Sequence, residues 1–393
     1  MRLFLLASFI FLIIPLETFS QDWPKESTLK WSLKREKVAE AKLSPNGGYL
    51  LLVESTSSFF SMNWGWNELY QGKIEFIESS TGKTVSMFSV CGGRKFGTNS
   101  FSFDGRFWAV TCSNGKAELW DITLPKKLLD FSPRKERQIE SLRLSPDGTR
   151  LLTFENSDTL TKATQNHATL WNAQNGKPIS DLYPNLTAGS KSANTFAEFN
   201  RDSSMLAVTF YRDVYLWDAE DGSLITKLTE DRFGASSATH ESLTYITKFS
   251  LDGTKLLSGG SRDATFKIWS TSAGKLLKTL KGHKSRTLGG SFSVDGEFVA
   301  TSDVSNNVKL WRVETGELVW SAKLKWWAYY LVFSPDRKNL FVGSERDGVA
   351  ILDVKTGKVV WQKKDRLKID QDWNFVVGFD KKSKYLRLLE FYK

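Results

Sequence analysis

A short turn sequence recurs along the chain and constrains its fold more than any other feature. It first reads LSPNGG at 43–48, directly before the apolar stretch YLLLVE. The other copies are FSFDGR at 101–106, LSPDGT at 144–149, FNRDSS at 199–204, FSLDGT at 249–254, FSVDGE at 292–297, FSPDRK at 333–338 and GFDKKS at 378–383. Because Asp, Asn and Gly supply the backbone conformations of tight turns, each copy predicts a β-hairpin.

A second signature follows most of the hairpins and consists of an apolar strand, a turn and another apolar strand. Its copies begin FIESSTGK, LWDITLPK, LWNAQNGK, LWDAEDGS, IWSTSAGK, LWRVETGE and ILDVKTGK. A hairpin followed by two more strands makes a unit of four antiparallel strands. Repetition of such a unit predicts an all-β fold, a β-propeller built from four-stranded blades.

The number of blades follows from counting the two signatures. The chain has eight copies of the first and seven of the second, and residues 28–33 (TLKWSL) predict an outer strand without inner partners of its own. We therefore expect a single β-propeller over residues 21–393 with eight blades. The last blade would be incomplete and closed by the N-terminal strand, which removes exposed sheet edges. A ring of seven blades is the alternative.

The unit at 240–280 resembles the WD-repeat family. The residues at the positions of the family's hydrogen-bonded tetrad are His240, Ser258, Asp263 and Trp269. His283 and Trp311 preserve part of the tetrad in the next unit, whereas other units lack the His or the Asp. The resemblance covers nearly all of the chain after residue 20, and it implies a platform for protein partners rather than an enzyme.

Other segments are similar to the repeats of quinoprotein-type propellers. They are DGVAILDVKTGKVVWQ at 347–362, ELVW at 317–320 and LKWSL at 29–33. Members of that family that act as dehydrogenases carry adjacent disulfide-forming cysteines and calcium ligands, and neither pattern occurs in this chain. Both families are propellers, so the expected fold is the same.

The first 20 residues have the pattern of a secretory signal peptide. Arg2 provides a positive charge, residues 3–16 are apolar, and Thr18-Phe19-Ser20 provide a small-residue exit. We expect residues 1–20 to be cleaved and the protein to be exported, either periplasmic or extracellular; an uncleaved anchor is the alternative. In an oxidising compartment Cys91 and Cys112 are potential disulfide partners, and two unpaired thiols are the alternative.

Irregular insertions gather on one face of the expected propeller. The spacing between signatures places extra residues at 54–73 and 155–168, between the second and third strands of two units, and the longest connections between blades contain 183–194 and 229–242. Loops that vary on a rigid scaffold usually carry binding. The largest insertion contains SFFSMNWGWNELYQG at 58–72, which we expect to form an aromatic loop.

Two interpretations of these aromatic residues remain open. In one, they form a contact lip, because Trp and Tyr provide large binding areas. The candidate residues are Phe59, Phe60, Trp64, Trp66 and Tyr70, with Trp326 and Trp327 from the connection before the seventh blade. In the other interpretation, the loop folds inward and caps the central channel.

The connections on the same face are also basic. The chain has a formal net charge of +10, and basic runs include KGHKSR at 281–286 and KLK at 323–325. Candidate binding arginines are Arg212, Arg262, Arg286 and Arg346. A one-sided positive field would attract an acidic protein, an anionic glycan or phospholipid headgroups. Surface lysines without any partner are the alternative.

Catalytic signatures are absent from the sequence. It contains three histidines, His167, His240 and His283, and no HExxH, GxSxG, CxxC or phosphate-loop motif. His240 and His283 fit structural positions, which leaves His167 for another role. We expect a monomeric, non-enzymatic module that scaffolds or binds a macromolecule, foremost a protein, without cofactor, metal or specific nucleic acid recognition. The alternatives are a periplasmic hydrolase or quinone-dependent oxidoreductase, or a glycan-binding propeller.

Overall fold

A computed structural model provides the structure of the chain. The residues that it describes are 27–34, 38–60, 68–133, 137–157, 167–182, 196–210, 212–229, 239–240, 244–260, 264–344, 347–364, 367–369, 375–380 and 385–391. Side chains at 54–60 and 68–73 are outside the description, as are a few others. The proposed signal peptide at 1–20 also lies outside the described residues.

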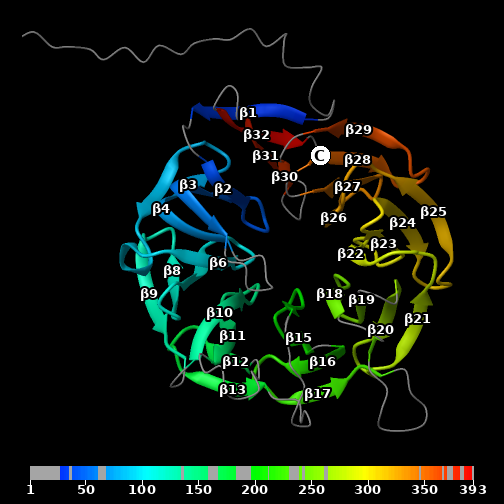
Figure 1. The fold of residues 1–393 in the computed structure, drawn as a ribbon, viewed down its shortest axis with the longest axis horizontal. Helices are drawn as coiled ribbons and strands as arrows, with labels where there is room; N and C mark the ends of the chain where they lie inside the picture. Colours follow the sequence, from blue (N-terminus) through cyan, green and yellow to red (C-terminus); the bar gives the residue numbers. More distant parts are fainter. Residues whose placement is uncertain are drawn as a thin grey trace, which may run out of the picture.

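The described strands form a ring of four-stranded antiparallel units (Figure 1). Six units are separate sheets, and a further sheet of eight strands divides into two units that are joined only where Tyr70 pairs with Phe96. The first of these two units contains β2 (Val38–Leu43), β3 (Tyr49–Phe60), β4 (Glu68–Glu78) and β5 (Thr84–Phe88). The second contains β6 (Phe96–Phe101), β7 (Phe107–Cys112), β8 (Ala117–Asp121) and β9 (Lys126–Phe131). The described residues therefore form eight units, which confirms the expected propeller.

The next five units repeat this order. The third and fourth contain β10 (Arg137–Leu144), β11 (Arg150–Ser157), β12 (His167–Asn172), β13 (Pro178–Leu182), β14 (Ala197–Phe199), β15 (Met205–Phe210), β16 (Asp213–Asp218) and β17 (Leu224–Lys227). The fifth and sixth contain β18 (Thr244–Phe249), β19 (Lys255–Gly260), β20 (Phe266–Ser270), β21 (Leu276–Leu280), β22 (Thr287–Phe292), β23 (Phe298–Asp303), β24 (Asn307–Arg312) and β25 (Leu318–Lys323). The seventh contains β26 (Tyr330–Phe333), β27 (Asn339–Gly343), β28 (Val349–Asp353) and β29 (Val359–Lys363).

The eighth unit joins the two ends of the described chain. Its strands are β30 (Leu367–Ile369), β31 (Phe375–Asp380), β32 (Tyr385–Phe391) and β1 (Ser27–Lys34), in that order. The antiparallel pairing of β1 with β32 runs from Ser27–Phe391 to Lys34–Tyr385, and Figure 1 shows these blue and red strands side by side. The N-terminal strand thus closes the ring, as expected.

One detail of the eighth unit differs from the sequence analysis. The turn sequence at 378–383 begins within β31 and precedes β32, which are the second and third strands of the unit, whereas the other seven copies join first and second strands. The additional strand is β30, whose three residues pair with β31. The C-terminal segment therefore contributes three strands and β1 is the fourth, so the eighth unit has four strands, whereas an incomplete last blade was expected.

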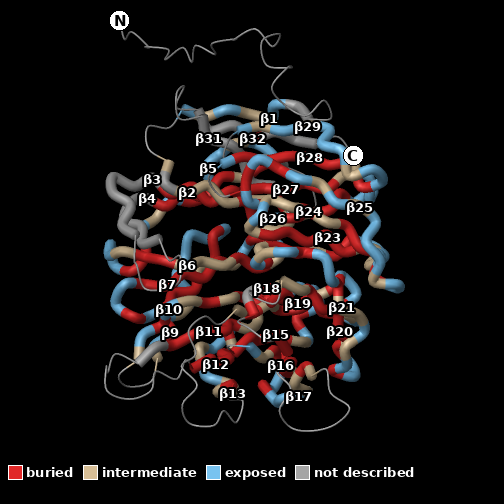
Figure 2. Tube along the Cα trace, turned by 45° about the vertical axis from the view of Figure 1, so that its right-hand side comes forward, coloured by how far each residue is buried: buried red, intermediate tan, exposed pale blue. Residues whose placement is uncertain are grey.

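The hydrophobic core lies between neighbouring units. Second and third strands are buried on both faces because each unit is covered on both sides, and β15 and β16 illustrate this with almost continuous burial. Fourth strands lie at the outside of the ring and are largely exposed, as in β17 and β25. Figure 2 shows this gradient from buried to exposed strands.

Two tryptophans dock neighbouring units in the same way. The indole Nε1 of Trp31 in β1 donates to the Ser79 carbonyl at 2.8 Å, and that of Trp320 in β25 donates to the Val354 carbonyl at 2.7 Å. Each ring lies against the glycine of a turn between third and fourth strands, where a Cβ on Gly82 or Gly357 would approach it within 2.8 or 2.7 Å. Trp31 therefore anchors the closing strand on the first unit.

The segment at 58–72 is partly strand rather than loop, which corrects the sequence analysis. Strands β3 and β4 extend as a hairpin in which Phe59 pairs with Leu69 and Phe60 with Glu68. A register shift between Ser55 and Ser57 interrupts the alternation of side chains, so no simple period marks these strands in the sequence. Only residues 61–67 of this insertion, with Trp64 and Trp66, lie outside the described residues.

Candidate binding face

The order of strands gives the propeller two different faces. Turns between first and second strands and between third and fourth strands share one end of every unit, which we call the hairpin face. Turns between second and third strands share the other end with the connections from unit to unit, which we call the crossing face. Both insertions predicted from the sequence lie on the crossing face, since they join β3 to β4 and β11 to β12.

The carboxylates of the hairpin face are used to build its turns. In one of them, Ser145 Oγ donates to Asp147 Oδ1 at 2.6 Å, and the Thr149 amide donates to the same oxygen at 3.0 Å. Burial favours a raised pKa of Asp147, but these hydrogen bonds outweigh it and hold the pKa below its usual value. The same arrangement recurs at Asp252, Asp295 and Asp336. These acids are structural.

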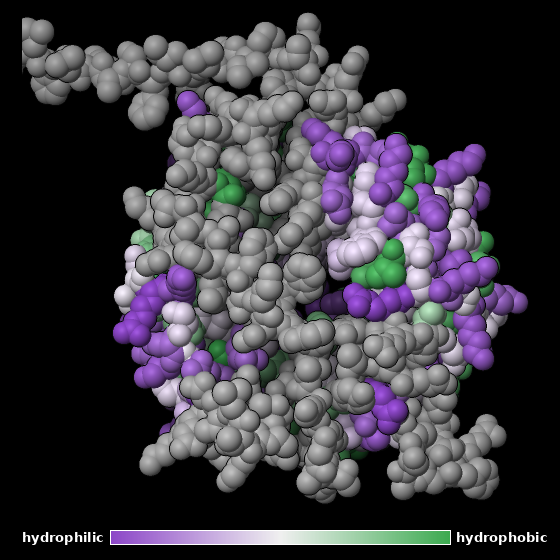
Figure 3. Space-filling view, in the orientation of Figure 1, coloured by the Kyte–Doolittle hydropathy of each residue, from purple (hydrophilic) through white to green (hydrophobic). Residues whose placement is uncertain are grey.

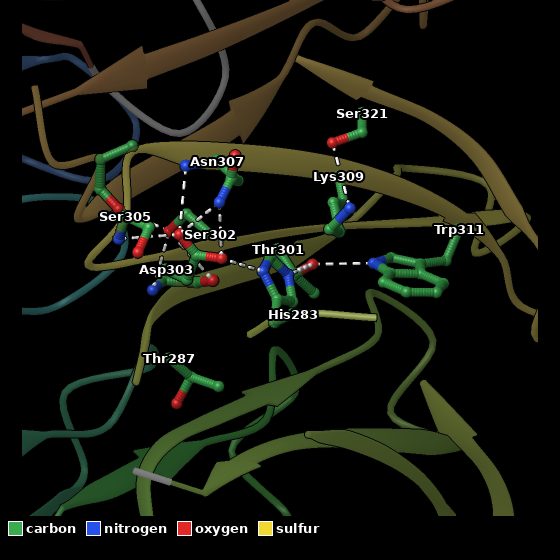
Figure 4. A network of polar contacts seen from close by, with 12 residues as sticks. His283, Thr287, Thr301, Ser302, Asp303, Ser305, Asn307, Lys309, Trp311 and Ser321 are labelled. Carbon is green, nitrogen blue, oxygen red and sulfur yellow. Dashed lines mark hydrogen bonds and ion pairs between the residues drawn. The ribbon is translucent and has the colours of Figure 1, made fainter. Parts of the chain in front are cut away.

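A complete polar tetrad spans the sixth unit (Figure 4). His283 Nδ1 lies 2.6 Å from Asp303 Oδ2, and His283 Nε2 lies 2.7 Å from Thr301 Oγ1, which accepts from Trp311 Nε1 at 2.7 Å. Burial lowers the pKa of His283 despite the neighbouring carboxylate. The hydrogen bonds from His283 and Asn307 hold the pKa of Asp303 low against the effect of burial. This network joins the connection before β22 to two strands of the unit.

Only half of this tetrad was predicted from the sequence. His283 and Trp311 were among the predicted residues, whereas Thr301 and Asp303 were not. Asp303 lies eight residues before Trp311, whereas Asp263 lies six residues before Trp269, so the acid has a different position in the repeat. The signal that could have found it is the Asp at the end of a second strand. In the fifth unit, His240 Nε2 lies 2.8 Å from Ser258 Oγ, which accepts from Trp269 Nε1 at 2.8 Å. Asp263 is outside the described residues.

In the second unit, a disulfide takes the place of the His–Asp contact. Cys91 and Cys112 are bonded, with their Cα atoms 5.4 Å apart. Cys91 precedes β6 as His283 precedes β22, and Cys112 ends β7 as Asp303 ends β23. Glu118 Oε2 accepts from the Cys91 amide at 2.9 Å and from Trp120 Nε1 at 3.0 Å. The same link between a connection and a second strand is therefore covalent here.

His167 is buried as well. It is the first residue of β12 and pairs in register with Glu155 of β11, and both side chains are buried. Burial raises the pKa of Glu155, which accepts from Thr153 Oγ1 at 3.3 Å and has Arg137 Nη1 at 3.6 Å. All three histidines of the chain are thus enclosed by strands. None is placed as an exposed general base.

The crossing face exposes aromatic side chains in the connection before β26 and at the first residue of that strand. Trp327 is 43% exposed and Tyr330 is 40% exposed. Trp326 is only 8% exposed, and its ring lies against Gly348, where a Cβ would approach it within 3.0 Å. The rings of Trp327 and Tyr329 meet edge to face with centroids 6.2 Å apart. Trp327 can therefore contact a partner directly, whereas Trp326 fills the core beneath it.

The other candidate binding residues have different positions. Phe59 and Phe60 lie in β3 and Tyr70 lies in β4, with side chains outside the description. Arg212 is exposed in the turn before β16, and its carbonyl accepts from the His240 amide at 3.2 Å. Arg286 is exposed on the connection before β22. Arg262 and Arg346 are outside the described residues. The structure thus brings Arg286 and Trp327 to neighbouring connections of one face.

Sequence comparisons match the chain to families of propeller repeats. A family model described as "WD domain, G-beta repeat" matches residues 235–270, and one described as "Outer membrane protein assembly factor BamB" matches residues 261–372. Apoptotic protease-activating factor 1 of Rattus norvegicus is 30% identical over 181 residues, which are 44% of this chain and 13% of that protein. WD repeat and SOCS box-containing protein 1 of Danio rerio is 26% identical over 262 residues, 64% of this chain and 57% of that protein. The chain thus spans less than two thirds of either relative.

A solved structure matches most of the ring. The computationally designed Ika8 protein superposes with a TM-score of 0.62 at 16% identity, covering 91% of this chain and 100% of that one, and at this identity it supports the fold alone. The ring of four-stranded units and its buried tetrads define a β-propeller. The family matches add that residues 235–270 are similar to WD repeats and that residues 261–372 are similar to BamB-type repeats.

Proposed function

We propose that this chain is an exported, non-enzymatic propeller that binds a protein partner through its crossing face. WD-repeat proteins typically act as interaction scaffolds, and one of the relatives named above is a WD repeat and SOCS box-containing protein. The described histidines and hairpin-face carboxylates support the proposal because they are engaged in structural networks. The crossing face, in contrast, combines exposed aromatic and basic side chains.

The observation that carries the proposal is the fixed exposure of Trp327. The connection that bears it is held at both ends, since the Leu324 amide donates to the Asn306 carbonyl at 2.8 Å and the Tyr329 amide donates to the Gly343 carbonyl at 2.8 Å. Trp326 anchors it from below. An aromatic side chain presented on a backbone that is already ordered can bind at low entropic cost.

Export is proposed from the pattern of residues 1–20. The disulfide between Cys91 and Cys112 supports it, because such bonds persist in oxidising compartments. No helix among the described residues has the length and apolar character needed to cross a membrane. Residues 21–393 would then form the mature propeller, in a periplasm or outside the cell.

A capture experiment tests the proposed face. The wild-type protein and the Trp327→Ala variant would be immobilised, and proteins captured from the exported fraction would be identified by mass spectrometry. The matched control is Leu124→Ala, which removes a side chain that is 62% exposed near the hairpin face. We expect specific partners to be lost with Trp327→Ala and retained with Leu124→Ala. Equal capture by all three proteins would contradict the proposal.

A further inference from the structure

Two connections of the crossing face meet over one turn of the sixth unit. The Val304 amide donates to the Arg286 carbonyl at 2.9 Å, and the Leu324 amide donates to the Asn306 carbonyl at 2.8 Å. The connection at 281–286 and the connection at 323–330 therefore flank the turn at 304–306 from its two sides. Side chains from both connections must share one continuous surface.

This surface is rich in positive charge. The exposed cationic residues on the two connections are Lys281, Lys284, Arg286, Lys323 and Lys325. No acidic residue occurs at 281–286, 304–307 or 323–330, and the nearby Asp303 is buried against His283. None of the residues that the structure describes forms an ion pair with any of the four lysines. Figure 3 shows hydrophilic side chains, mixed with paler and hydrophobic ones, on the side of the ring that contains β22–β29.

An apolar contact lies at one end of the charged surface. Trp327 follows Lys325 after one buried residue, and Tyr330 begins β26 three residues later. We call the surface formed by the cations and these exposed rings the basic–aromatic patch. Each of the two rings is more than half covered by protein.

We infer that the basic–aromatic patch binds an acidic peptide segment of the protein partner. This inference rests on the proposed function, and it adds the chemistry of the partner. Carboxylates of the segment would lie against the lysines on both sides of the turn, and an apolar side chain of the same segment would cover Trp327. A uniformly charged polyanion would bind the lysines but would make no apolar contact with the Trp327 ring. An acidic peptide that also carries an apolar side chain can contact both.

Fluorescence anisotropy with labelled synthetic peptides tests this inference. The probes are a short peptide that alternates Glu with Leu and a matched peptide with Gln at every Glu position. We expect the Glu peptide to bind at least about tenfold more tightly at low ionic strength, and its affinity to fall as salt is raised. Lys284→Gln with Lys325→Gln should weaken it by about tenfold, and Trp327→Ala should weaken it by a similar factor.

The matched control replaces Lys355 and Lys358 by Gln on the hairpin face, where both lysines are exposed. This double variant has the same net charge as the patch variant and should bind the Glu peptide like the wild type. Equal binding of the Glu and Gln peptides would overturn the inference, and so would an equal loss in both double variants. The capture experiment with Trp327→Ala judges the proposed function separately, because natural partners can depend on Trp327 without being acidic.

Two further probes decide between classes of partner. Heparin and vesicles containing phosphatidylserine would be measured against the same variants. Weaker binding of both probes than of the Glu peptide, with no effect of Trp327→Ala on them, supports a peptide. Tighter binding of heparin or vesicles than of the Glu peptide, lost in the patch variant alone, would assign the patch to a glycan or a membrane surface and overturn the inference.

Discussion

Removal of the disulfide should weaken one unit of the ring by a predictable amount. The bond joins residues that are 21 apart in sequence, and closing a loop of this length in the unfolded chain is worth about 3 kcal/mol. Cys91 also has a φ of 57°, in the left-handed region that favours glycine, and the covalent bond helps to hold it there. Replacing Cys91 and Cys112 by Ser should therefore lower the free energy of unfolding by about 3 kcal/mol.

The effect should be local as well as large. The disulfide ties the connection before β6 to the end of β7, so amide exchange should accelerate first in these two strands. Urea unfolding followed by tryptophan fluorescence gives the total loss, and hydrogen exchange with mass spectrometry gives its location. Wild-type protein in reductant should behave like the double variant.

A neighbouring substitution provides the control. Ser113 follows Cys112, is exposed, and uses its backbone amide in a bond to the Lys95 carbonyl. Ser113→Ala should change stability by no more than about 0.5 kcal/mol. An unchanged urea midpoint in the double variant with Cys91→Ser and Cys112→Ser, or faster exchange spread evenly over all units, would refute the reasoning.

Two other predictions concern buried contacts of the ring. Because burial holds the pKa of folded His283 below its unfolded value of about 6.5, the unfolded chain binds the proton more readily, and stability should fall as pH drops below about 6.5. Urea midpoints at several pH values measure this, and His283→Gln should remove that part of the slope; an identical slope in the variant would contradict the assignment. Gly82→Ala should cost about 2 kcal/mol or more, because its φ of +70° disfavours a Cβ and the Trp31 ring lies 2.8 Å from where that Cβ would be. Gly296→Ala is the control, because Gly296 has the same φ and no atom lies within 4 Å of the added Cβ. The difference in thermal stability between the two variants measures the contribution of Trp31 docking. Equal losses of stability would mean that this docking contributes nothing.

The architecture could be predicted from the sequence because turn chemistry is local. Asp, Asn and Gly at fixed places define a hairpin whatever surrounds it, and the unpaired strand around Trp31 required a partner at the other end of the chain. At 378–383 the same turn chemistry led to a wrong prediction of which strands of the unit the turn joins. There, the tertiary pairing of β30 decided which strands the turn joins.

Several features of the candidate face depended on information that the sequence does not contain. Trp326 and Trp327 are adjacent residues of the same type, so the sequence does not show which of the two is buried. Only the packing of Trp326 against Gly348 decides this. The hairpin around Phe59 was interpreted as a loop because a bulge breaks the period of two. Asp303 was missed because its side chain reaches His283 from a different place in the repeat. Sequence spacing alone left the pairing of the cysteines open, since it does not give the direction of their Cβ atoms.

The pairing of β1 with β32 has a consequence for biogenesis. β1 cannot find its partner until β32 has been synthesised, because β32 follows every other described strand. The eighth unit therefore stays incomplete until the rest of the described chain has been made. Closure of the ring is therefore a late step in folding, because it joins strands from opposite ends of the described chain.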